Sequence, residues 1–67
     1  MLRIETEKEE DGRWIAEVPA LPGVLAYGAT KAEAGAKVQA LALRVIADRL
    51  ENGERLPAEL SGVFEAA

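Results

Sequence analysis

Acidic side chains are the groups in this sequence best suited to carry out chemistry. Glu5, Glu7, Asp11 and Glu17 lie in the first part of the chain, where strands of a sheet could gather them. Carboxylates grouped in this way bind divalent cations in metal-dependent nucleases. The alternative is a solvated sheet face and hairpin tip, because Asp11 belongs to the acidic turn Glu9–Asp11 and neither histidine nor lysine is placed to support a metal. We favour the solvated face.

Other catalytic groups are scarce. The chain has no cysteine and no histidine, which excludes disulfides, thiolate chemistry, imidazole acid–base catalysis and typical zinc sites. No general base is recognisable beside a hydroxyl group such as that of Thr6 or Ser61. Gly23, Gly28 and Gly35 are spaced wrongly for a phosphate-binding loop. The sequence therefore predicts no enzyme activity, no cofactor and no metal.

The length and charge of the chain narrow the class of partner. Sixty-seven residues, 49% of them hydrophobic and 30% charged, predict one globular domain over residues 1–67. Twelve acidic against eight basic residues give a net charge of −4, which opposes binding to DNA or RNA and favours a basic protein partner. Neither a membrane span nor a signal peptide is recognisable, so we expect a cytoplasmic protein without a membrane partner.

Three short strands are predicted in the first half. Apolar and charged residues alternate over Leu2–Glu7 and again over Arg13–Val18, and the intervening Asp11-Gly12 favours a hairpin turn. Pro19 ends the second strand, because it lacks a backbone N–H. Pro22-Gly23 fits the centre of a type II turn. A third strand over residues 24–28 follows.

One long helix is predicted next. Thr30-Lys31-Ala32-Glu33 is typical of a capping box, and good helix formers continue from Lys31 to about Glu51. Asn52-Gly53 then suits the end of a helix. Residues 61–65 form either a short fourth strand or a packed tail. The order β-β-β-α-β predicts an α+β fold, in which one small antiparallel sheet is covered by one helix.

The helix carries more apolar surface than a small sheet can cover. Its apolar arc spans about 200°, against the roughly 100° that packing on one sheet requires. One explanation is that Leu43 and Leu50 lie beneath a C-terminal tail containing Phe64. The other, which we favour, is self-association into a dimer or tetramer. We therefore expect an oligomer interface at Leu43, Ile46 and Leu50.

Strand alternation separates the two sheet faces. Trp14 shares its face with Ala16 and Val18, and we expect this face beneath the helix. Ile15 and Glu17 then lie on the opposite face. There Ile15 would form the apolar centre of a partner-binding patch whose acidic members are Glu5, Glu7 and Glu17. A one-residue error in register would instead expose Trp14.

Two segments resemble the N-terminal domain of the HicB-like antitoxin family. These segments are residues 11–23 (DGRWIAEVPALPG) and 27–34 (YGATKAEA), and the likeness extends over about residues 1–57. The shared features are an aromatic residue after the hairpin glycine, a strand ending in Val-Pro, a Leu-Pro-Gly turn, and Gly-x-Thr opening a helix. The chain departs from the family pattern at Ala20, Val24, Ala29 and Gly35.

The resemblance implies a partial ribonuclease-H-like fold, homo-oligomers, and neutralisation of a small basic HicA-type toxin that cleaves mRNA. Complete family members add a DNA-binding domain, which is not recognisable here, so we expect no direct DNA binding. Our leading hypothesis is a stand-alone antitoxin-type protein that masks such a toxin through Glu5, Glu7, Ile15 and Glu17. One alternative is a homo-oligomeric module that binds a small molecule or RNA fragment. Another is the metal-dependent nuclease considered above.

Overall fold

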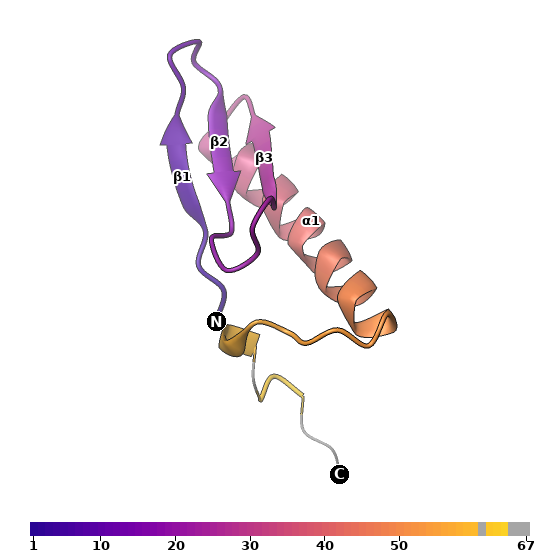
Figure 1. Ribbon diagram of the computed structural model, residues 1–67. Helices are drawn as coiled ribbons and strands as arrows, with labels where there is room; N and C mark the ends of the chain where they lie inside the picture. The colour runs from indigo at the N-terminus through magenta and orange to yellow at the C-terminus, as the bar shows by residue number, and fades with distance from the viewer. Residues whose placement is uncertain (61, 65–67) are drawn as a thin grey trace.

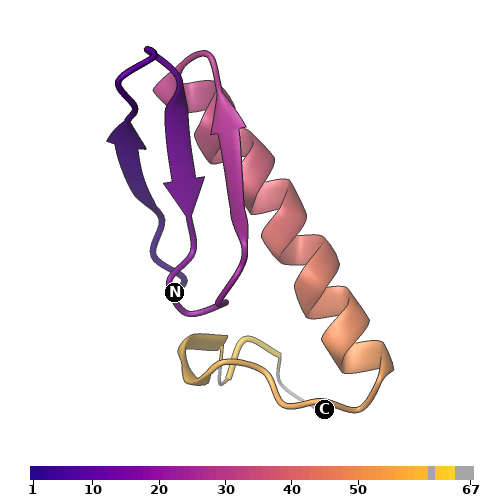
Figure 2. The same ribbon diagram turned by 45° about the horizontal axis from the view of Figure 1, so that its top comes forward.

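The computed structural model describes residues 1–60 and 62–64, and it has the α+β architecture expected from the sequence. A three-stranded antiparallel sheet precedes one long helix that lies across one of its faces (Figures 1 and 2). The elements in chain order are β1 (Glu5–Lys8), β2 (Trp14–Glu17), β3 (Leu25–Gly28), α1 (Lys31–Glu51) and a 3₁₀ turn (Ala58–Leu60).

The strands are shorter than predicted but have the predicted alternation. The sheet order is β1-β2-β3, and Thr6, Ala16 and Ala26 are paired across it. The β1–β2 ladder ends at Glu5 and Glu17, where the prediction extended β1 back to Leu2. In this register Arg3 would face Pro19, which has no N–H to donate. The proline therefore shortens both strands.

Both tight turns form where the sequence predicts them. At the hairpin tip the Gly12 N–H donates to the Glu9 carbonyl over 3.0 Å, and Gly12 has a φ of 90°. In the second turn the Val24 N–H donates to the Leu21 carbonyl, also over 3.0 Å, while Gly23 has a φ of 86°. A positive φ at the third of four residues is the mark of a type II turn, which confirms that prediction.

The limits of α1 match the prediction at both ends. Thr30 Oγ1 accepts a hydrogen bond from the Glu33 N–H over 3.0 Å. The second bond of the predicted capping box is replaced, because the Glu33 carboxylate lies 3.0 Å from Lys37 Nζ instead. At the other end the Asn52 N–H donates to the Asp48 carbonyl, and Gly53 adopts a φ of 73°. These bonds satisfy backbone groups that a helix end leaves unpaired.

The core between sheet and helix is small. Its buried members are Ala16, Val18, Leu21, Val24, Ala34, Val38 and Ala42. Trp14 is half-buried and packs against this cluster, as predicted. At Gly28 an added Cβ would lie only 2.5 Å from the Ala34 backbone nitrogen, so the missing side chain lets α1 start against β3. The sheet face that carries Trp14 is therefore the one beneath the helix.

The C-terminal segment does not form the predicted strand in its described part. Residues 62–64 adopt a turn and a bend, and Ser61 and Glu65 lie outside the described residues. The Leu60 N–H donates to the Pro57 carbonyl and the Val63 N–H to the Leu60 carbonyl, so local turns occupy these backbone groups. The segment returns from the end of α1 toward the chain start (Figure 2), where the Met1 amino group donates to the Glu59 carbonyl over 2.9 Å.

This segment also leaves the apolar helix surface uncovered. Leu43 is 67% exposed, Leu50 is 47% exposed and Phe64 is 79% exposed. The alternative in which the tail shields these leucines is therefore wrong for the described residues. Within the same residues no helix is long and apolar enough to cross a membrane.

Candidate functional site

The sheet face turned away from α1 carries six side chains in two rows, which we call the open face. One row runs Glu7, Ile15, Tyr27 across the three strands, and the other runs Glu5, Glu17, Leu25. The neighbouring residues Ala16 and Ala26 point the other way, into the core or against it. The alternation of the strands therefore separates a covered apolar face from an uncovered mixed one.

The structure brings together the four residues predicted to bind a partner. Glu5, Glu7, Ile15 and Glu17 line one depression, together with Thr6. Ile15 is half-buried, whereas the three glutamates are exposed. The carboxylates lie beside Ile15 on β1 and β2, whereas Tyr27 is its neighbour on β3.

Two further members of the open face were missed in the sequence analysis. Leu25 and Tyr27 are both exposed, and they extend the apolar centre from Ile15 onto β3. The signal was present, because Leu25 and Tyr27 alternate with Ala26 as Ile15 alternates with Ala16. Without the β2–β3 register, however, their parity relative to Ile15 was undefined.

An arginine braces one edge of the open face. The Arg13 N–H donates to Asp11 Oδ1 over 3.0 Å, and Arg13 Nε donates to Asp11 Oδ2 over 2.7 Å. The guanidinium carbon of Arg13 lies 4.6 Å from the centre of the Tyr27 ring, a cation–π distance. The pKa of Asp11 is lowered, chiefly by the backbone N–H of Arg13 and further by its guanidinium. This contact links the hairpin tip to β3.

The metal site that the nuclease alternative requires is not found among the described residues. Asp11 is engaged by Arg13 at the hairpin tip, whereas Glu5 and Glu17 form the pair at the opposite end of the β1–β2 ladder. In the part of the chain that the structure describes, no group of three acidic side chains could hold a metal ion. The four carboxylates are therefore divided between two ends of the hairpin.

The glutamates of the open face repel one another. Glu5 and Glu17 are directly paired across β1 and β2, and Glu7 lies two residues further along the same face. Like charges facing each other across strands are destabilising. The ion pairs found among residues 1–60 and 62–64 join Arg13 to Asp11 and Lys37 to Glu33, and neither reaches these three carboxylates. A cationic partner would relieve this repulsion.

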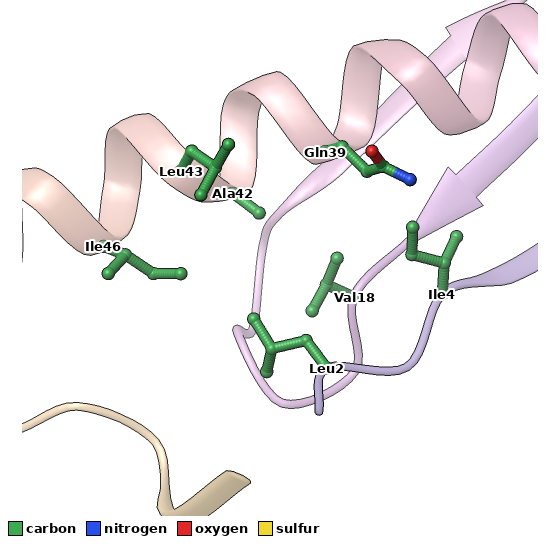
Figure 3. A pocket seen from close by; sticks show the side chains of 7 residues that line it. All are labelled: Leu2, Ile4, Val18, Gln39, Ala42, Leu43 and Ile46. Carbon is green, nitrogen blue, oxygen red and sulfur yellow. The ribbon is translucent and has the colours of Figure 1, made fainter. Parts of the chain in front are cut away.

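The predicted oligomer residues lie on a second surface. Leu43 and Leu50 are exposed, and Ile46 is half-buried. Leu43 and Ile46 border an apolar pocket of about 210 Å³ between α1 and the start of the chain (Figure 3). Its other lining residues are Leu2, Ile4, Val18, Gln39 and Ala42.

Comparisons of the chain with protein-family models, with curated proteins and with solved structures found no match.

Proposed function

We propose that this chain is a HicB-like antitoxin-type module, which binds and masks a small basic mRNA-cleaving toxin of the HicA type through its open face. One observation carries the proposal. Glu5, Glu7 and Glu17 border the apolar centre on its β1 side, with no cation paired to them among the described residues. The family resemblance of residues 11–23 and 27–34 supplies the class of partner.

The two parts of the open face have different tasks in binding. Carboxylates at the rim attract a basic protein and raise the rate of encounter, an effect that salt screens. The apolar surface of the open face is formed by Ile15, Leu25 and Tyr27. This surface is removed from contact with water when the complex forms, and its burial slows dissociation. The cation–π contact with Arg13 holds the Tyr27 ring in place before binding.

Masking follows from competition for the same cations. A protein that cleaves mRNA needs basic side chains to hold the phosphate backbone. If those side chains pair with Glu5, Glu7 and Glu17, they are no longer accessible to RNA. The acidic surface thus acts as a substitute for the phosphates, and neutralisation requires no catalytic group on this chain.

The test is a binding measurement with a HicA-type toxin at several salt concentrations. The double variant Glu5→Lys/Glu17→Lys should associate more slowly than the parent and lose most of the salt dependence, because the attraction is removed. Ile15→Glu should mainly accelerate dissociation, because it places a charge in the desolvated centre.

The matched control is Glu51→Lys, which reverses an exposed charge at the end of α1. We expect toxin binding by this variant to equal that of the parent within about twofold, because the rim of the open face is unchanged. If the double variant and Ile15→Glu also bound the toxin as the parent does, the open face would be ruled out as the toxin-binding surface.

A further inference from the structure

The outer edge of β1 has no partner strand among the described residues. The sheet order β1-β2-β3 leaves β1 paired on one side only (Figure 1). Just beyond β1 the Glu9 N–H donates to the Arg13 carbonyl over 2.7 Å. Because bonded and non-bonded pairs alternate along an antiparallel ladder, Glu7 also directs its backbone groups toward β2. The N–H and C=O groups of Thr6 and Lys8 therefore point outward from the sheet.

We propose that this edge accepts an extended segment of a basic protein partner as a fourth, antiparallel strand. The inference rests on the proposed function for the basic class of the partner, but it concerns the backbone of β1 rather than the side chains of the open face. Strand addition at a sheet edge is a common mode of peptide recognition, in which main-chain bonds supply affinity and alternate side chains supply specificity.

The charge beside the edge favours a basic occupant. Glu5 and Glu7 lie on the open face of β1, and both are exposed. In an antiparallel addition the residues opposite them form non-bonded pairs, in which the side chains approach most closely. Lysine or arginine at these two positions would pair with the carboxylates. A second copy of β1 centred on Thr6 would instead place Glu5 against Glu7, and like charges so placed repel.

A groove on the helix side of the same edge has room for the other side chains of the added strand. Its sheet wall is formed by Ile4 and Thr6. The residues of α1 that line it are Lys31, Ala32, Gly35, Ala36 and Gln39. Three of these five are alanine or glycine, and a Cβ added to Gly35 would meet nothing within 4 Å. Apolar residues that alternate with the basic ones would fill this space.

The length of the groove suits an extended segment. Ile4 and Gln39 also line the apolar pocket beside Leu43 and Ile46 (Figure 3), so the two hollows adjoin. Together they follow α1 from Lys31 to Ile46, roughly 22 Å at 1.5 Å per residue. A strand of about six residues has a similar length at about 3.4 Å per residue. A single short strand can therefore cover both hollows.

The other sheet edge is less suited to a basic segment. β3 carries no charged side chain, and the guanidinium of Arg13 already lies against the Tyr27 ring there. The helix also packs more extensively against β3 than against β1. Charge and free space therefore both select the β1 edge.

A short peptide in which lysine and valine alternate is the probe. In the proposed register its valines exchange backbone bonds with Thr6 and Lys8, while its lysine N–H groups face away from β1. Methylation of the valine nitrogens should weaken binding about tenfold in an NMR titration, because the methyl groups remove main-chain bonds. The matched control carries the methyl groups on its lysine nitrogens and should bind within about threefold of the unmethylated peptide. Strand addition is overturned if the unmethylated peptide does not bind at millimolar concentration, or if the two methylated peptides bind equally.

A variant of the chain tests the same bonds from the other side. Thr6→Pro removes an outward N–H but no bond to β2, and proline is tolerated at a free sheet edge. The variant should keep its circular dichroism spectrum and bind the peptide about tenfold more weakly. Thr6→Val retains the N–H and should bind the peptide as the parent does. Undiminished binding by folded Thr6→Pro would contradict the proposed register.

Amide hydrogen exchange separates this inference from the proposed function. The amides of Thr6 and Lys8 should exchange rapidly in the free chain and become protected when a HicA-type toxin binds. Rapid exchange of both amides in the toxin complex would overturn strand addition and leave toxin binding by the open face intact. A toxin that does not bind would overturn the proposed function, and the peptide would still test the edge. Protection of both amides in the free chain at rising concentration would place a second copy at the edge and overturn the basic occupant.

Discussion

Two residues, Gly28 and Arg13, determine how neighbouring elements of this protein contact one another. Gly28 allows α1 to begin against β3, because any Cβ there would collide with the Ala34 backbone. Arg13 joins the hairpin tip to β3 through Asp11 and the Tyr27 ring. The first contact joins elements that are adjacent in the chain, whereas the second joins residues fourteen positions apart.

Gly28→Ala should destabilise the fold by about 2–3 kcal/mol, since the new methyl group meets backbone and the close approach must widen. The free energy of unfolding in urea measures this effect. Ala29→Gly, a change at the exposed neighbouring position, is the control and should have a much smaller effect. An unchanged midpoint for Gly28→Ala would show that β3 and α1 can separate without loss.

The pH dependence of Asp11 follows from its contacts with Arg13. Because the pKa of Asp11 is lowered in the fold, the stabilisation is present above the pKa of the unfolded chain and is lost as pH falls through the folded value. A carbon NMR titration should therefore place the Asp11 pKa below its usual range. Arg13→Gln should raise this pKa only part of the way, since the backbone N–H of residue 13, the larger cause, remains. A complete return to the usual value would contradict this assignment.

The helix α1 has a buried side and a side with exposed leucines. Its buried side contains Ala34, Val38 and Ala42, which pack on the sheet, while Leu43 and Leu50 are exposed. Thr30 sets the start of α1 through its bond to the Glu33 N–H. The same cap therefore determines where both sides begin.

Thr30→Ala should lower the free energy of unfolding by about 1 kcal/mol, because the Glu33 N–H loses its acceptor. Thr30→Ser should retain most of the stability, since its hydroxyl can accept the same bond. Urea unfolding of the two variants provides the comparison. Equal stability of the alanine and serine variants would mean that the cap contributes nothing.

Gly35→Ala tests what a glycine inside α1 costs within one chain. Alanine should raise the free energy of unfolding by about 0.5–1 kcal/mol, because it favours the helix and a Cβ added there would meet nothing within 4 Å. Urea unfolding measures this effect. A lower free energy of unfolding for Gly35→Ala would show that the added methyl group is not accommodated.

The whole molecule is more extended than its length requires. Its radius of gyration is 13.4 Å, whereas a compact domain of this length has about 11 Å. Among the described residues its core contains seven buried residues, and three of them are alanines. So small a core supplies limited stability on its own, and association through an exposed apolar surface is a common remedy.

The melting temperature should therefore rise with protein concentration, because dimer formation stabilises only the folded chain. Leu43→Glu should abolish this dependence while leaving the far-ultraviolet circular dichroism spectrum unchanged at low temperature, since Leu43 is exposed within one chain. Arg44→Lys, which keeps both charge and exposure, is the control. A concentration-independent melting temperature for the parent would argue against self-association.

Much of this structure follows from local patterns in the amino-acid sequence. The helix limits, both glycine turns and the alternation of Trp14 with Ile15 depend on contacts among near neighbours, so cap residues, turn residues and strand periodicity suffice to predict them. The placement of Glu5, Glu7, Ile15 and Glu17 on one face needed only the hairpin register. The charge of that face follows from the same register, because three of these four residues are glutamates.

Other features depended on contacts between distant segments. The register of β3 on β2 adds Leu25 and Tyr27 to the open face, and no local pattern specifies it. Residues 62–64 could form a strand only by reaching a sheet edge. Local turns after Pro57 form in their place. The exposure of Leu43 and Leu50 likewise required knowing where this segment runs. Such features depend on the balance of competing long-range contacts, which is settled only when the whole chain packs.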